Sequence, residues 1–199
     1  EQVGEETARA ELGIICGSGL GPIGDAVEDA TILPYGKIPG FPATHVVGHK
    51  GNMIFGKLGG KKVVCLQGRF HPYEHNMDLA LCTLPVRVMH QLGIKIMIVS
   101  NAAGGINTVL RHGDLMLIKD HIFLPALAGF SPLVGTCHEV TVARQCGIKV
   151  LGFSLITNIA NLDCDTSVEV SHEEVLDIAK QGGERASLFV SDIIKELNI

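Results

Sequence analysis

The stretch Lys61-Lys-Val-Val-Cys-Leu-Gln-Gly-Arg69-Phe-His71-Pro-Tyr73-Glu-His75 joins an apolar run to a cluster of polar side chains. Residues 61–67 are typical of a buried β-strand. A glycine follows, and a guanidinium, an imidazole and a phenol come in close succession after it. Open α/β sheets bind ligands at the carboxyl ends of their strands, and a guanidinium can hold an oxyanion through two parallel N–H bonds. The stretch therefore predicts an anion site, with an exposed polar loop as the alternative.

Three more apolar runs end in the same way, in glycine or in small polar residues. Continuous apolar runs are typical of parallel strands that are buried on both faces. Four polar residues thus lie just beyond the carboxyl ends of predicted strands, and we expect them to share one pocket. The strands and the residues that follow them are 12–16 with Ser18, 61–67 with Arg69, 95–99 with Asn101, and 149–156 with Asn158.

Each of these junctions also has a plainer interpretation. The loop Gly17-Ser-Gly-Leu-Gly21 could cradle a phosphate together with the positive end of the helix after it, or it could be a tight turn. Pro22 stands where a dinucleotide fingerprint needs its last glycine, which disfavours a nicotinamide-dependent oxidoreductase. The motif Asn101-Ala-Ala-Gly-Gly105 allows close backbone approach to a ligand, or it forms a crowded turn. Asn158 offers both a donor and an acceptor to a heterocycle, although a lone asparagine more often forms a turn.

The remaining pattern predicts further strands and several helices in one α/β domain that spans residues 1–199. Gly59-Gly60 predicts a hairpin, Pro85 a helix kink, and Ser171-His-Glu-Glu174 a capping box that starts the last helix. Gly182-Gly183 could bend or break that helix. The predicted helices are residues 23–30, 77–92, 140–146 and 171–197, and the additional strands are 45–47, 53–58 and 115–118, the last of them buried.

Composition excludes several classes of protein. The formal net charge of −5 and a pI near 6.0 leave no basic face for nucleic acid. No apolar run approaches the roughly 20 residues that span a bilayer, and the first residues do not resemble a signal peptide, so no membrane partner is expected. Six scattered cysteines are typical of free thiols in a reducing compartment, which predicts a cytoplasmic protein. The histidine spacing predicts no metal site.

Five motifs, taken together and in order, resemble the trimeric (low-molecular-mass) purine nucleoside phosphorylases. Each motif is moderately specific, but the five in the correct order are very specific and extend over nearly the whole chain. They are Ile15-Cys-Gly-Ser-Gly-Leu-Gly21, Gln67-Gly-Arg-Phe-His71 with Tyr73-Glu74, Val99-Ser-Asn-Ala-Ala-Gly-Gly105, Gly152-Phe-Ser-Leu-Ile-Thr-Asn158, and His172-Glu-Glu-Val-Leu176.

The resemblance implies an α/β fold with a mixed, distorted central β-sheet flanked by helices. It implies reversible phosphorolysis of inosine- or guanosine-type nucleosides by a homotrimer, with phosphate as co-substrate and no cofactor. Asn158 and His71 would be the catalytic residues. By position, phosphate would be bound by Ser18, Arg69, His71 and the backbone of Ala102; ribose by Tyr73 and His172; and the purine by Asn158, Ala103 and Gly104.

The chain departs from that family between Gly135 and Thr136. There the family has a long segment with a helix, sheet strands, a glutamate for the base, an aromatic residue lent to a neighbouring subunit, and a Met-Ser pair. Either the natural polypeptide contains a segment that this sequence omits, or the segment is lost. We favour omission, because deleting sheet strands exposes backbone groups that must otherwise be paired. A true deletion would leave a catalytically inactive relative that binds phosphate or nucleoside.

Overall fold

The computed structural model describes residues 3–4, 9–46, 48–123, 136–160 and 172–199, and it excludes the side chains of 172–176. Within these ranges, seven strands form a single sheet in the order β2-β3-β4-β1-β5-β7-β6. This mixed sheet confirms the expected fold class. The strands are β1 (Leu12–Cys16), β2 (Glu28–Pro34), β3 (Asn52–Leu58), β4 (Lys61–Gln67), β5 (Ile96–Gly105), β6 (Leu115–Ile118) and β7 (Lys149–Ile159).

The centre of the sheet is parallel and its two flanks are antiparallel. Strand β1 pairs in parallel with β4 on one side and β5 on the other, and β5 pairs in parallel with β7. Strands β2, β3 and β6 are antiparallel to their neighbours, and the hairpin predicted at Gly59-Gly60 joins β3 to β4. The carboxyl ends of β4, β1, β5 and β7 therefore meet at one edge of the sheet.

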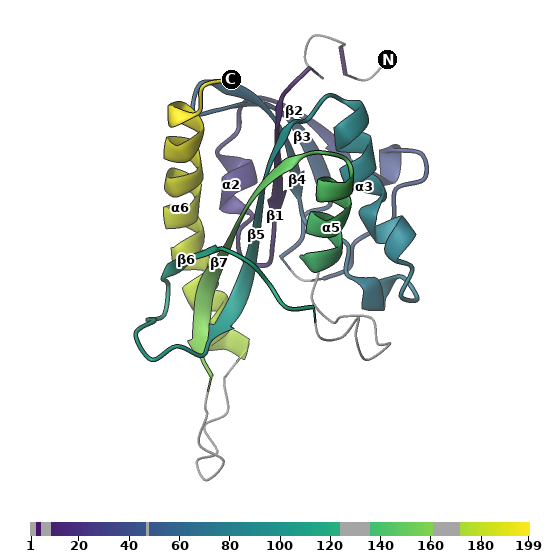
Figure 1. Cartoon of the computed structure of the whole chain (residues 1–199). Helices are drawn as coiled ribbons and strands as arrows, with labels where there is room; N and C mark the ends of the chain where they lie inside the picture. The colour runs from purple at the N-terminus through teal and green to yellow at the C-terminus, as the bar shows by residue number, and fades with distance from the viewer. Residues whose placement is uncertain (1–2, 5–8, 47, 124–135, 161–171) are drawn as a thin grey trace.

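Helices cover both faces of the sheet (Figure 1). On one face α2 and α6 pack over a core that includes Ile14, Cys65 and Ile98 from the central strands. On the other face α3 and α5 cover a second core. Each fully buried Ile or Leu contributes about 1.5–3 kcal/mol to folding. The helices are α2 (Pro22–Asp25), α3 (Leu79–Gln91), α5 (Cys137–Gln145) and α6 (His172–Glu196), with 3₁₀ turns η1 (Tyr35–Lys37) and η2 (Pro72–Glu74).

Some predicted elements differ from the structure for local reasons. The helix expected over 23–30 ends at Asp25, because the β-branched run that begins near Thr31 pairs with β3 instead. The helix expected from 77 begins at Leu79, since Met77 has a φ of 62° and Asp78 accepts the Leu81 N–H at its Oδ1 (2.9 Å). The strand expected at 45–47 does not form at His45. The strand at 115–118, which the sequence predicts to be buried, is half-buried or exposed, because β6 is the last strand in the sheet order and pairs only with β7 among the described strands.

The glycine pair in α6 does not break the helix. A Cβ on Gly182 would lie 2.5 Å from a methyl carbon of Leu155, and one on Gly183 would lie 2.6 Å from the Gly19 carbonyl oxygen. The two glycines therefore allow α6 to lie directly against β7 and against the loop that follows β1. The capping box expected at 171–174 falls outside the described residues and side chains. Within the described chain no helix is long and apolar enough to cross a membrane.

Candidate active site

The glycine loop after β1 is held against the neighbouring strand β5. The Gly17 N–H donates to Ser100 Oγ at 3.3 Å, and that hydroxyl donates to the Ile15 carbonyl at 3.1 Å. A Cβ on Gly17 would lie 2.5 Å from the Ser100 carbonyl oxygen, so no larger residue fits. The helix after the loop has only four residues, so the loop and its neighbours, rather than a helix dipole, must supply any anion binding.

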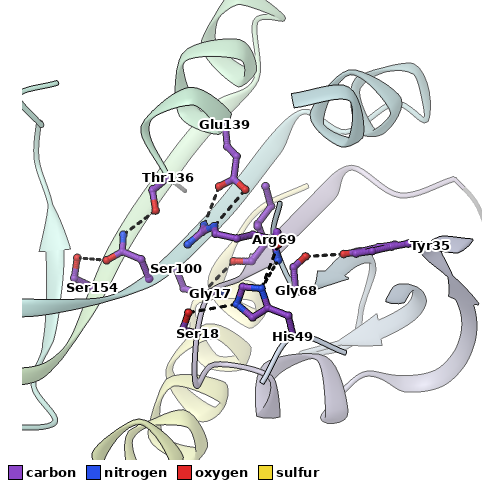
Figure 2. A network of polar contacts seen from close by, with 12 residues as sticks. Gly17, Ser18, Tyr35, His49, Gly68, Arg69, Ser100, Thr136, Glu139 and Ser154 are labelled. Atoms are coloured by element: carbon purple, nitrogen blue, oxygen red, sulfur yellow. Dashed lines mark hydrogen bonds and ion pairs between the residues drawn. The ribbon is translucent and has the colours of Figure 1, made fainter. Parts of the chain in front are cut away.

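Ser18 and Arg69 are linked through a histidine that the sequence did not single out (Figure 2). Ser18 Oγ lies 3.3 Å from His49 Nε2. His49 Nδ1 lies 3.2 Å from the Arg69 carbonyl oxygen and 3.3 Å from its amide nitrogen, so the tautomer decides which of the two it pairs with. Burial, and then the Arg69 charge, lower the pKa of His49. Ser18 and Arg69, both expected beyond the carboxyl ends of strands, are thus connected through the His49 ring.

The Arg69 guanidinium is buried and makes a two-bond ion pair with Glu139 in the first turn of α5. Arg69 Nη2 donates to Oε2 at 2.8 Å, and Nε donates to Oε1 at 3.3 Å. The two side chains are 2% and 4% exposed. Burial raises the pKa of the Glu139 carboxyl, and the Arg69 charge opposes that shift. Glu139 could not be predicted from the sequence, because one glutamate in a predicted helix does not indicate a partner 70 residues away.

His71 and Tyr73 lie together after Arg69. Their rings stack with centroids 5.0 Å apart, and the His71 ring stacks on His49 at 5.2 Å. Both ring nitrogens of His71 are buried without a hydrogen-bond partner among the described residues. Burial, followed by the Arg69 charge, lowers the pKa of His71 to about 4, so its ring is neutral at pH 7. Tyr73 is 46% exposed, and its phenol is accessible from outside.

The turn that carries these two rings is fixed by Glu74. Glu74 Oε1 accepts the backbone N–H of His45 at 2.8 Å, and Oε2 accepts that of His71 at 3.4 Å. Glu74 therefore connects η2 to the segment that bears His49.

The polar motif at 101–105 lies within β5 rather than beyond its end, which corrects the sequence prediction. The side-chain amide of Asn101 forms two hydrogen bonds within the fold. Its Nδ2 donates to Thr136 Oγ1 at 3.2 Å, and its Oδ1 accepts from the Ser154 hydroxyl at 2.8 Å. The register of β5 with β1 ends at Val99, whereas its register with β7 runs on to Gly105. Around Ala102, β5 thus has no strand partner on its β1 side among the described strands.

Asn158 also lies inside its strand, near the carboxyl end of β7. It is the register partner of Gly104, next to an irregularity between Ala103 and Gly104. A Cβ on Gly104 would lie 3.0 Å from Asn158 Nδ2, so the carboxamide lies directly over this glycine. Thr157 Oγ1 donates to Asn158 Oδ1 at 3.3 Å, which leaves the Nδ2 donors for another partner. The three residues predicted to contact a base are therefore adjacent.

Two predictions, for His172 and for the absence of a metal site, concern parts of the chain that the structure describes only incompletely. His172 is the first residue of α6, but its side chain is not among those described. In the described part of the chain, no group of three His, Cys, Asp or Glu side chains could hold a metal ion.

The site contains a second buried histidine, and its protonation should make the fold acid-sensitive. Burial, and then the Arg69 charge, lower the pKa of His138 to about 4. Between pH 6.5 and pH 4, His138 therefore binds a proton in the unfolded chain but stays neutral in the folded protein. The free energy of unfolding falls as the pH falls. His138 should account for about 2 kcal/mol of the loss between pH 7 and pH 5.

Urea denaturation at the two pH values tests this expectation. His138→Leu should unfold with a smaller difference between pH 7 and pH 5 than the original protein does. An equal difference in the two proteins would show that the ring is not held neutral.

The chain matches known proteins over nearly its whole length. The profile of the phosphorylase superfamily matches residues 11–137 and 135–195. Purine nucleoside phosphorylase from Mus musculus is 34% identical over 260 residues, which cover 95% of this chain and 90% of the mouse protein. The purine nucleoside phosphorylase of Anopheles gambiae is 33% identical, and its alignment covers 96% of this chain and 74% of the mosquito protein.

Solved structures agree with these sequence matches. The crystal structure of Schistosoma mansoni purine nucleoside phosphorylase in complex with inosine superposes with a TM-score of 0.86 at 35% identity and covers 100% of both chains. The glycine loop, Arg69 and Asn158 of the present chain lie toward the carboxyl ends of the parallel strands β1, β4 and β7. The chain belongs to the phosphorylase superfamily and, within it, to the purine nucleoside phosphorylases.

Proposed function

We propose that the protein catalyses the reversible phosphorolysis of purine ribonucleosides and deoxyribonucleosides of the inosine and guanosine type. The products are the free purine and (deoxy)ribose 1-phosphate. One observation carries the proposal: in a chain of this family, the Ser18 hydroxyl, the Arg69 guanidinium and the Asn158 carboxamide come from strands whose carboxyl ends share one edge. A relative crystallised with inosine supports the substrate class.

In this proposal phosphate lies between the glycine loop and Arg69. Ser18 and the neutral His71 ring supply hydrogen bonds, Arg69 supplies charge, and the Ala102 N–H can donate from the unpaired side of β5. The phosphate is itself the nucleophile, so no side chain has to attack the sugar. Holding phosphate against the anomeric carbon removes the entropic cost of bringing the reactants together.

The base and the sugar take the neighbouring positions in the proposed site. Breaking the N-glycosidic bond builds positive charge on the sugar and negative charge on the purine. An Asn158 N–H that donates to N7 therefore binds the transition state more tightly than the substrate. Ala103 and Gly104 would lie against the purine, and Tyr73 and His172 would bind the ribose hydroxyls.

We also propose that the natural polypeptide contains a segment between Gly135 and Thr136, which would complete the single phosphorylase domain. Supporting this, the mouse alignment extends over 260 residues, so at least 61 of its positions have no counterpart among the 199 residues here. The two stretches of the family match meet at residues 135–137. A cavity of about 430 Å³ beside Thr136, lined by Ile118, Val140 and Val150 among others, offers apolar surface for such a segment to cover.

An assay with inosine and phosphate, on protein whose intact mass has been measured, tests both proposals. We expect a mass well above 21.2 kDa and phosphate-dependent release of hypoxanthine with ribose 1-phosphate. Folded protein that contains the segment and yet shows no turnover would contradict the enzymatic proposal. Folded protein of 21.2 kDa would contradict the segment and favour an inactive relative that only binds phosphate or nucleoside.

The wider setting is proposed by analogy with the family. We propose a homotrimeric cytoplasmic enzyme of purine salvage that needs no metal and no cofactor besides its co-substrate phosphate, and that binds neither nucleic acid nor membrane. The acidic net charge of −5 and the scattered cysteines support this setting. Light scattering on the same sample should give about three times the mass of the chain.

A further inference from the structure

Arg69, which the proposed function assigns to the phosphate site, forms an ion pair with Glu139. A carboxylate beside a bound dianion repels it, and removing two charges from water is energetically costly. The pair is nevertheless almost fully buried, and it joins the carboxyl end of β4 to the first turn of α5. Because its charge opposes phosphate binding, Glu139 must contribute to the site through its geometry if it contributes at all.

The geometry of the pair shows what that effect is. The Glu139 carboxylate accepts hydrogen bonds from Nε and Nη2 of the guanidinium, which Figure 2 shows as two dashed contacts. Nη1 makes no hydrogen bond with any described residue, and a Cβ on Gly17 would lie 2.9 Å from it. The free edge of the guanidinium therefore faces the glycine loop that carries Ser18.

Both anchors of the pair are rigid. Arg69 follows a buried central strand that is paired on both sides, and Glu139 lies on a helix that packs against α3 and β7. An arginine side chain has several rotatable bonds, and fixing them costs conformational entropy. If a carboxylate already fixes these bonds in the empty site, the loss of side-chain entropy no longer opposes phosphate binding.

We infer that Glu139 is a positioning residue, which holds the Arg69 guanidinium so that its free Nη1 edge faces the glycine loop and receives phosphate. This inference rests on the proposed function for the identity of the anion. Glu139 acts through Arg69 and does not itself touch phosphate.

Two substitutions separate this role from two simpler ones. Glu139→Asp keeps the charge but shortens the reach, whereas Glu139→Gln keeps the length but removes the charge. Positioning predicts that both weaken binding of inorganic phosphate, by about tenfold or more if one charged hydrogen bond is lost, with the KM for inosine nearly unchanged. A plain counter-ion predicts tighter phosphate binding in Glu139→Gln. A plain tether between α5 and β4 predicts a lower melting temperature with an unchanged phosphate Kd.

The measurement is calorimetric titration of the folded protein with inorganic phosphate, accompanied by inosine kinetics. Glu11→Gln is the matched control, since Glu11 forms an exposed ion pair with Lys95 away from the site. In a double-mutant cycle, adding Glu139→Gln to Arg69→Gln should weaken phosphate binding no further, because the residue acts through Arg69. Tighter binding in Glu139→Gln, an unchanged Kd in both single variants, or fully additive losses would each overturn the inference.

The same experiment keeps this inference distinct from the proposed function. Phosphate binding without any turnover of inosine would count against the proposed function, while the Kd values would still report on Glu139. Normal turnover with unaltered phosphate Kd in the Glu139 variants would count against Glu139 alone.

Discussion

Arg69→Gln is expected to raise the phosphate concentration needed for half-maximal turnover by about 10² to 10⁴-fold, with little change in the KM for inosine. Two charge-assisted hydrogen bonds are worth about 3–6 kcal/mol together, and each 1.4 kcal/mol is a factor of ten. Glutamine is preferable to alanine here, because its amide can still donate to Glu139. Alanine would leave that carboxylate buried and unpaired.

Steady-state kinetics at several fixed phosphate concentrations measures this effect. Arg9→Gln removes an exposed arginine elsewhere in the fold and should leave the phosphate dependence as it was. An unaltered phosphate dependence in folded Arg69→Gln would remove this guanidinium from the phosphate site.

Asn158→Ala is expected to lower kcat/KM for inosine by about 10²–10³, the usual loss when one donor to a developing anion is removed. The proposed contact strengthens as the base departs, so the loss should fall mainly on kcat. The Kd for phosphate should stay the same, because Asn158 on β7 lies over Gly104 of β5 and takes no part in the Ser18–His49–Arg69 contacts. Asn158→Asp should lose activity as well, since a carboxylate cannot donate to N7.

Kinetics and phosphate titration on the same preparations test this separation. The control is Asn198→Ala, which changes an exposed asparagine near the end of the chain and should have no effect. Equal losses in turnover and in phosphate affinity for Asn158→Ala would contradict the assigned role and would point to a general disturbance of β7.

The parallel centre of the fold could be predicted because its strands form uninterrupted apolar runs in the sequence. Residues 12–16, 61–67 and 149–156 each give that signal, and a parallel sheet then places their carboxyl ends together. The β5 and β7 strands extend past the polar residues Asn101 and Asn158, which the sequence did not indicate. Their pairing to Gly105 and Ile159 is a tertiary contact that overrides local composition.

The partners of the site residues could not be predicted for a similar reason. His49 lies in a segment without periodicity, and Glu139 lies on a short helix 70 residues after Arg69. Neither side chain contacts Arg69 until folding brings β4, α5 and the loop before β3 together. Sequence spacing reports only neighbours along one element, whereas these contacts join separate elements.

The proposed reaction requires phosphate and the purine to meet at the carboxyl ends of the parallel strands. A crystal structure with hypoxanthine and ribose 1-phosphate tests this most directly. We expect the phosphate within hydrogen-bonding distance of Ser18 Oγ and Arg69 Nη1, and the purine N7 within the same distance of Asn158 Nδ2. A phosphate bound elsewhere on the molecule, with the Ser18 and Arg69 contacts unchanged, would contradict it.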